Sequence, residues 1–78
     1  MADFTWAQKR ELKRLAAITR HETIESPRTS TRRFMRAKFY NMGLVVAYVA
    51  TSGTDMLRLT DAGLALADSF TNVDQWVG

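Results

Sequence analysis

The chain of 78 residues contains no cysteine, one histidine and one proline, and its four glycines are scattered at positions 43, 53, 63 and 78. Without cysteine, neither a disulfide nor a cysteine-ligated zinc ion can brace the fold. A single histidine leaves no set of nucleophile, base and orienting group, and scattered glycines leave no loop that cradles phosphate. His21 with Glu22 and Glu25 makes a poor metal or acid–base group. We therefore expect no enzyme, no cofactor, no metal site and no small-molecule ligand.

Long hydrophobic runs are also lacking, and none approaches the length of a membrane span. The first six residues do not have the basic-then-apolar build of a signal peptide. We expect a cytoplasmic protein with no membrane partner. The length predicts one domain over residues 1–78, with residues 1–5 and 71–78 as terminal segments. A hydrophobic fraction of 46% indicates a folded chain.

The second half of the chain has almost no positive charge. Residues 44–78 contain Arg58 against four aspartates, a net charge of −3, whereas residues 1–43 contain ten Lys/Arg against four acids, a net charge of +6. A solvated basic face is the simplest interpretation of such asymmetry. We favour the alternative, a positive surface that binds an anionic partner, and nucleic acid is the first candidate.

Helical signals mark the first third of the chain. Thr5 and Gln8 fit a capping box, which predicts a helix that starts at Thr5. The side that should face the core carries Gln8, Leu12, Leu15, Ala16 and Thr19 at helical spacing. Residues 18–29 leave two alternatives open: the first helix runs on to about residue 24, or a short separate helix occupies residues 19–25. Pro27 predicts a break just before Arg28.

A second clear helix should start at Thr29 or Ser30, either of which is a good N-cap, and end at Gly43. At helical spacing, Met35, Phe39 and Met42 form one stripe. The opposite side of this helix carries Arg33, Arg36, Ala37 and Tyr40, and Arg32 lies at its edge.

The remaining pattern predicts two strands and a helix. Residues 44–50 and 56–60 are apolar or β-branched and flank a turn at residues 51–55. Thr60 or Asp61 then caps a helix that runs through about Ser69. We expect this helix to bury Gly63, Leu66, Ala67 and Phe70. Val73 and Trp76 in the tail should fold back onto the body.

Two short motifs in this order support a resemblance to a known family. They are Gly43-Leu44-Val45, which ends the arginine-bearing helix, and Leu59-Thr60-Asp61-Ala62-Gly63, which follows the hairpin. Over residues 28–67 the chain resembles winged helix-turn-helix proteins of the small bacterial or phage regulator type. The resemblance implies an α+β fold with three N-terminal helical segments, a two-stranded β-hairpin wing and a C-terminal helix.

The same resemblance implies a function. It places six residues against DNA: Arg28, Ser30, Arg32, Arg33, Arg36 and Tyr40. It places the wing tip at Ser52, Gly53 and Thr54, with Arg58 on the return strand, as a weaker set. Lys9, Lys13 and Thr29 are further candidates for phosphate contacts. The expected function is double-stranded DNA binding by a small transcriptional regulator or phage accessory factor, with a homodimer left open. The alternative is a winged-helix adaptor for proteins or a virion assembly component without a DNA role.

Overall fold

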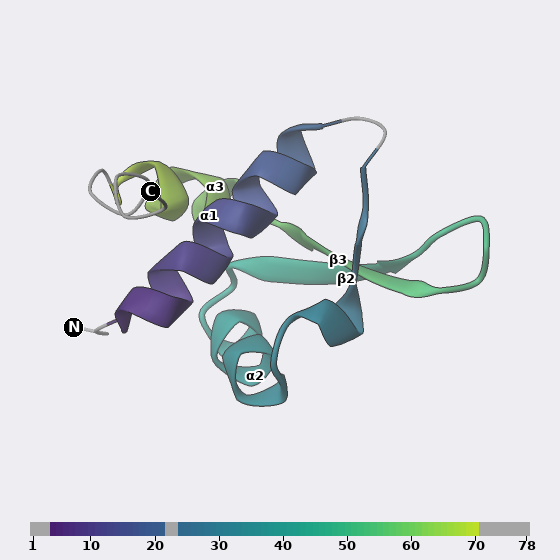
Figure 1. The fold of residues 1–78 in the computed structure, drawn as a ribbon, viewed down its shortest axis with the longest axis horizontal. Helices are drawn as coiled ribbons and strands as arrows, with labels where there is room; N and C mark the ends of the chain where they lie inside the picture. The colour runs from purple at the N-terminus through teal and green to yellow at the C-terminus, as the bar shows by residue number, and fades with distance from the viewer. Residues whose placement is uncertain (1–3, 22–23, 71–78) are drawn as a thin grey trace.

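A computed structural model describes residues 4–21 and 24–70 (Figure 1). Within these residues the fold is α+β, with three α-helices and a three-stranded antiparallel sheet in the order β1-β3-β2. The elements are α1 (Trp6–Arg20), β1 (Ser26–Pro27), the 3-10 turn η1 (Arg28–Ser30), α2 (Arg33–Asn41), β2 (Val45–Val49), β3 (Asp55–Leu59) and α3 (Asp61–Asp68). The predicted packing of Val73 and Trp76, and the terminal segment 71–78, lie outside the described residues.

Helix α1 begins as its sequence predicts. The Thr5 hydroxyl accepts from the Gln8 backbone N–H, and the Gln8 side chain accepts from the Thr5 backbone N–H. These two bonds satisfy backbone donors that the first turn of a helix leaves without intrahelical partners. Leu12, Leu15 and Ala16 of the predicted stripe are buried, whereas Gln8 and Thr19 are only partly buried.

Both alternatives for residues 18–29 are wrong. Helix α1 ends at Arg20, residues 24–25 are not helical, and Ser26 and Pro27 form a strand that pairs with Leu57 and Met56 of β3. Proline disfavours the helical conformation in the residue before it, which suits Ser26 to an extended backbone. The sheet therefore gains a third strand that the sequence did not predict, in addition to the β2–β3 hairpin.

Helix α2 starts at Arg33, so the N-cap predicted at Thr29 or Ser30 is wrong. Those two residues belong to η1, and Arg32 is the N-cap without a side-chain hydrogen bond. The end of α2 is confirmed. Gly43 has a φ of 71°, its N–H donates to the Tyr40 carbonyl, and the next N–H donates to the Phe39 carbonyl. This bond pair is the Schellman motif, which glycine favours because it adopts a positive φ without steric cost.

The hairpin pairs Val45 with Leu59 and Val49 with Asp55, so both predicted strands are confirmed with ends shifted by about one residue. Thr60, one of the two predicted N-caps of α3, caps this helix because its hydroxyl accepts a hydrogen bond from the Gly63 N–H. Gly63 is buried so close to the chain entering β2 that a Cβ there would overlap the Leu44 carbonyl oxygen.

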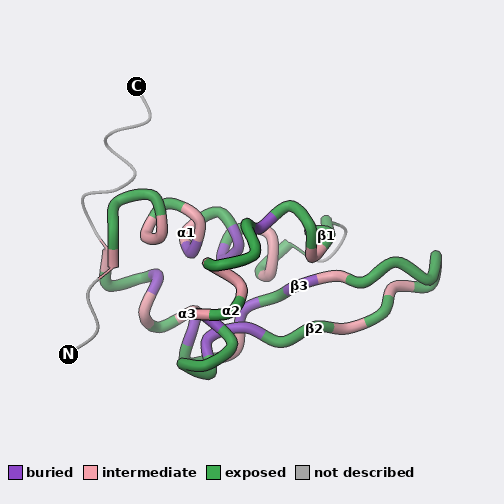
Figure 2. The backbone as a smooth tube through the Cα atoms, turned by 90° about the horizontal axis from the view of Figure 1, so that it is seen from below, coloured by how far each residue is buried: buried purple, intermediate pink, exposed green. Residues whose placement is uncertain are grey.

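The core lies where α1, the sheet, α2 and α3 meet, and the hairpin extends away from it (Figures 1 and 2). Ala67 of α3 is buried as predicted, whereas Leu66 and Phe70 are only partly buried against the core. The buried apolar residues are Leu12, Leu15, Ala16, Phe39, Leu44, Val45, Leu57, Leu59 and Ala67. No helix in the described part of the chain has both the length and the apolar character needed to cross a membrane.

Candidate nucleic-acid interface

Helix α2 lies at the lower edge of the molecule in Figure 1, with α1 and α3 above it. Phe39 is fully buried and defines the inner side of the helix. At about 100° per residue, the positions most nearly opposite Phe39 are Arg33, Phe34, Ala37 and Asn41. All four are exposed, and we call them the outer face of α2. Tyr40 is 39% exposed at the edge of this face.

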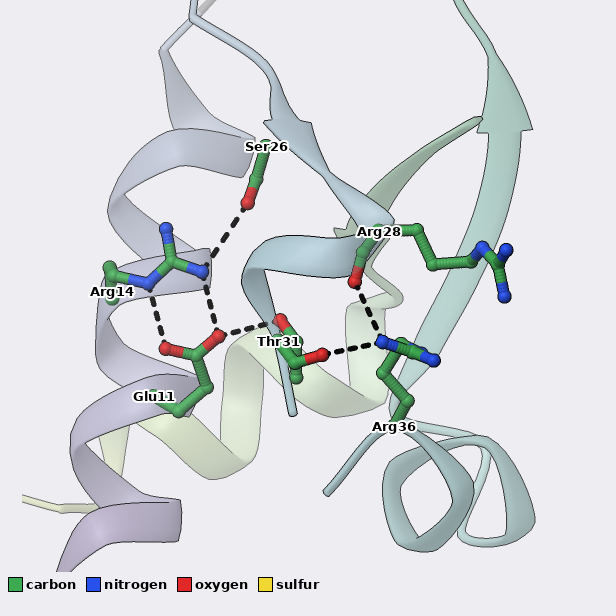
Figure 3. Close-up of polar contacts among 6 residues, drawn as sticks. All are labelled: Glu11, Arg14, Ser26, Arg28, Thr31 and Arg36. Atoms are coloured by element: carbon green, nitrogen blue, oxygen red, sulfur yellow. Dashed lines mark hydrogen bonds and ion pairs between the residues drawn. The ribbon is translucent and has the colours of Figure 1, made fainter. Parts of the chain in front are cut away.

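The sequence placed Arg36 beside Arg33, but the structure uses Arg36 differently. It is half-buried, and its Nη1 donates to the Thr31 carbonyl at 2.7 Å and to the Arg28 carbonyl at 3.3 Å (Figure 3). These two carbonyls belong to η1 and the residue after it. The Arg36 side chain therefore anchors η1 to α2 instead of pointing outward with Arg33.

Arg28 also has an intramolecular partner. Its Nη2 lies 3.8 Å from an Asp55 carboxylate oxygen at the start of β3, and both side chains are largely exposed. At this distance and exposure the ion pair is weak, but the aspartate lowers the positive potential around Arg28. Thr29 and Ser30 are exposed beside it on η1, three to four residues before α2 begins. They therefore do not lie at the N-terminus of α2.

A polar network holds η1 and β1 between α1 and α2 (Figure 3). Arg14 donates from Nε and Nη2 to the two carboxylate oxygens of Glu11, each at 2.7 Å, and its Nη2 also donates to the Ser26 hydroxyl at 3.3 Å. The fully buried Thr31 hydroxyl donates to Glu11 at 2.6 Å. The hydrogen bonds to Glu11 raise the pKa of Arg14. This network sets the position from which Arg32 and α2 leave the body.

A groove of about 420 Å³ runs between the first half of α1 and the start of α2. The Arg10 guanidinium stacks 5.3 Å from the centre of the Trp6 ring, which is 38% exposed. The groove is lined by Trp6, Ala7, Arg10, Glu11, Arg14, Ser30, Arg32 and Met35. Trp6, Arg10 and Arg14 are not among the site residues expected from the sequence, although their spacing of four puts them on one helix face.

Lys9 and Lys13, the predicted phosphate contacts on α1, lie against α3 and against Phe70, two residues after its end. The Lys13 Nζ donates to the Ala67 carbonyl at 3.3 Å, and the Lys9 Nζ lies 5.5 Å from the centre of the Phe70 ring. On the same side, Arg20 makes two hydrogen bonds to Asp68 that lower the pKa of this carboxyl. The structure therefore does not bring these lysines together with the arginines of the groove.

The three residues of the predicted wing tip are exposed. The Ser52 hydroxyl donates to the Thr54 hydroxyl at 3.2 Å, and Gly53 adopts a φ of 86°. Arg58 is exposed, and the register of β3 turns it to the sheet face opposite Leu57 and Leu59. It lies there apart from the tip.

A depression of about 240 Å³ between the end of α1 and the sheet is lined by His21, Glu25, Tyr48 and Arg58, among others. The Tyr48 hydroxyl donates to Glu25 at 2.7 Å, and this bond raises the Tyr48 pKa. Glu22 lies outside the described residues. In the part of the chain that the structure describes, no three His, Cys, Asp or Glu side chains gather as a metal site would require.

No protein-family model, curated protein or solved structure matches the chain. The function therefore has to be inferred from the side chains described above.

Proposed function

We propose that the chain is a winged-helix module that binds double-stranded DNA by laying the outer face of α2 in the major groove. A small transcriptional regulator or phage accessory factor is the role that fits it best. The order of elements supports this assignment: a long helix, a short strand, a helical turn, the arginine-bearing helix, a hairpin and a last helix. In this arrangement η1 takes the place of the short second helix, and the β2–β3 hairpin is the wing.

The observation that most supports DNA binding is the exposed, unpaired charge at the start of α2. Arg32 and Arg33 are exposed, and the side chain of neither makes an ion pair or hydrogen bond with a described residue. Arg10 lies with Arg32 along the adjoining groove. Arginine binds guanine O6 and N7 through two hydrogen bonds and also clamps phosphates. The B-DNA major groove, about 12 Å wide, admits one α-helix.

The proposal is tested by fluorescence anisotropy with a labelled random duplex at two salt concentrations. The variants are Arg33→Gln and, as the charge-matched control, Arg20→Gln, because Arg20 pairs with Asp68 at the junction of α1 with α3. Wild-type binding should weaken steeply with salt, because each neutralised phosphate adds about 0.9 to the slope of log K against log salt concentration.

Arg33→Gln should lower the affinity for the duplex and reduce that slope by about 1, whereas Arg20→Gln should change neither by a comparable amount. Equal losses in the two variants would place the interface elsewhere. No binding by the wild-type protein even at low salt would reject DNA as the partner and favour a protein-docking role.

A further inference from the structure

Phe34 is the most exposed large hydrophobic residue in the described part of the chain, with 87% of its surface accessible. It lies on the outer face of α2, directly after Arg33 and one turn before the exposed Ala37. The next most exposed large apolar side chain, Val49 at 66%, lies on β2. Phe34 is thus an apolar group on the helix face that is proposed to enter DNA.

The charges around Phe34 narrow the choice of partner. Arg32 and Arg33 precede it, and no acidic residue occurs between residues 26 and 54. If Phe34 entered an apolar pocket of another protein, Arg32 and Arg33 would lie against that protein without an opposite charge to pair with. A polyanion instead attracts both arginines. Inside the major groove, the apolar group that base pairs offer is the C5 methyl of thymine, and phenylalanine and alanine are side chains that contact it.

We propose that Phe34, with Ala37 beside it, makes the protein select thymine by packing against the C5 methyl group. The inference rests on the DNA-binding function proposed above and assigns one of its determinants of specificity. Arg33 is the neighbouring group that would read guanine. The apolar surface of Phe34 is then removed from water only when α2 lies in the major groove. Phosphate contacts alone do not depend on which base lies beside them.

The experiment compares the same DNA sequences with and without the methyl group. A random duplex pool is enriched on the full-length wild-type protein and then amplified with either dTTP or dUTP. The second pool keeps every sequence and every hydrogen-bonding group but lacks the thymine methyls. Wild type, Phe34→Ala and Val49→Ala are titrated against both pools by anisotropy. Val49→Ala is the matched control, because it also shortens an exposed apolar side chain.

We expect wild type and Val49→Ala to bind the uracil pool about fourfold more weakly than the thymine pool, the effect of losing one buried methyl contact. Phe34→Ala should discriminate between the pools by clearly less than fourfold, because alanine covers less of the methyl group than phenylalanine does. Equal wild-type binding to both pools would overturn the role of Phe34 and leave DNA binding intact. Discrimination that stays fourfold in Phe34→Ala would overturn it as well. Failure of the wild type to enrich or bind any pool would instead reject the proposed function itself.

Discussion

Replacing Glu11 by alanine would test the network that positions α2. Glu11 is the one acidic residue of α1, and it accepts three hydrogen bonds, two from Arg14 and one from Thr31. Its side chain is 14% exposed, whereas that of Arg14 is 39% exposed. The two partners should therefore respond differently when the carboxylate is removed.

The larger effect comes from Thr31, whose hydroxyl is fully buried. A buried donor that loses its acceptor costs about 1–3 kcal/mol. Arg14 can turn to solvent, so its lost ion pair adds only about 0–1 kcal/mol. We expect the free energy of unfolding to fall by about 2–3 kcal/mol, a large part of the ~4–12 kcal/mol typical of a domain of this length. The corresponding fall in Tm is roughly 10–20 °C.

Urea unfolding followed by circular dichroism measures this loss. Glu25→Ala is the control, because it removes an exposed carboxylate that accepts one exposed hydrogen bond from Tyr48. Adding Thr31→Val to Glu11→Ala should restore part of the stability, since the hydroxyl without an acceptor is then gone. If Glu11→Ala were no less stable than Glu25→Ala, or if the valine restored nothing, the reasoning about the buried hydroxyl would be wrong.

Three further variants address the body, the sheet and the hairpin. Gly63→Ala should destabilise the fold by about 1–3 kcal/mol in urea unfolding, because the added Cβ meets the carbonyl oxygen that precedes β2, and this outweighs the ~1 kcal/mol gained in helix propensity. The raised pKa of Tyr48 predicts that tyrosinate absorbance appears at higher pH in wild type than in Glu25→Gln. Because the pKa is raised in the folded state, the associated stability is present below the unfolded-state pKa and is lost as the pH rises through the folded-state pKa. Asp55→Asn should strengthen duplex binding at low salt by releasing Arg28, and unchanged affinity would place that arginine outside the interface.

The parts of the fold that could be predicted from the sequence are those decided by neighbours in the chain. Thr5 and Thr60 cap helices by bonding a backbone N–H three residues on, and Gly43 ends α2 through its own backbone freedom. Such signals need only four or five consecutive residues. The hairpin belongs to the same class, since its turn and alternating strands lie within fifteen residues, 45–59.

The segment from Ser26 to Thr31 could not be predicted in this way, because its partners are distant in sequence. Ser26 pairs with Leu57, and Thr31 bonds Glu11, twenty residues earlier. Thr29 and Ser30 have good capping side chains, yet the helix starts at Arg33. A helix cap at Thr29 or Ser30 would contribute only about 1 kcal/mol of stability. This is less than the combined contribution of the buried Thr31 hydroxyl bonded to a carboxylate and of the pairing of β1 with β3.

The orientation of α2 shows the same limit at the candidate interface. The sequence pattern groups Arg36 with Arg33 because it takes the stripe of Met35, Phe39 and Met42 as the inner side of the helix, yet Met42 is 38% exposed and only Phe39 of the three is fully buried. In the structure the Arg36 guanidinium donates hydrogen bonds to the carbonyls of residues 28 and 31. Because Phe39 is buried, residues 34 and 41 lie on the exposed side of the helix. The polar side chains expected to read DNA thus change from Arg33 with Arg36 to Arg33 with Asn41, a residue type that pairs with adenine. The apolar Phe34 next to Arg33 could be recognised as part of the proposed interface only once the helix had been placed against the body.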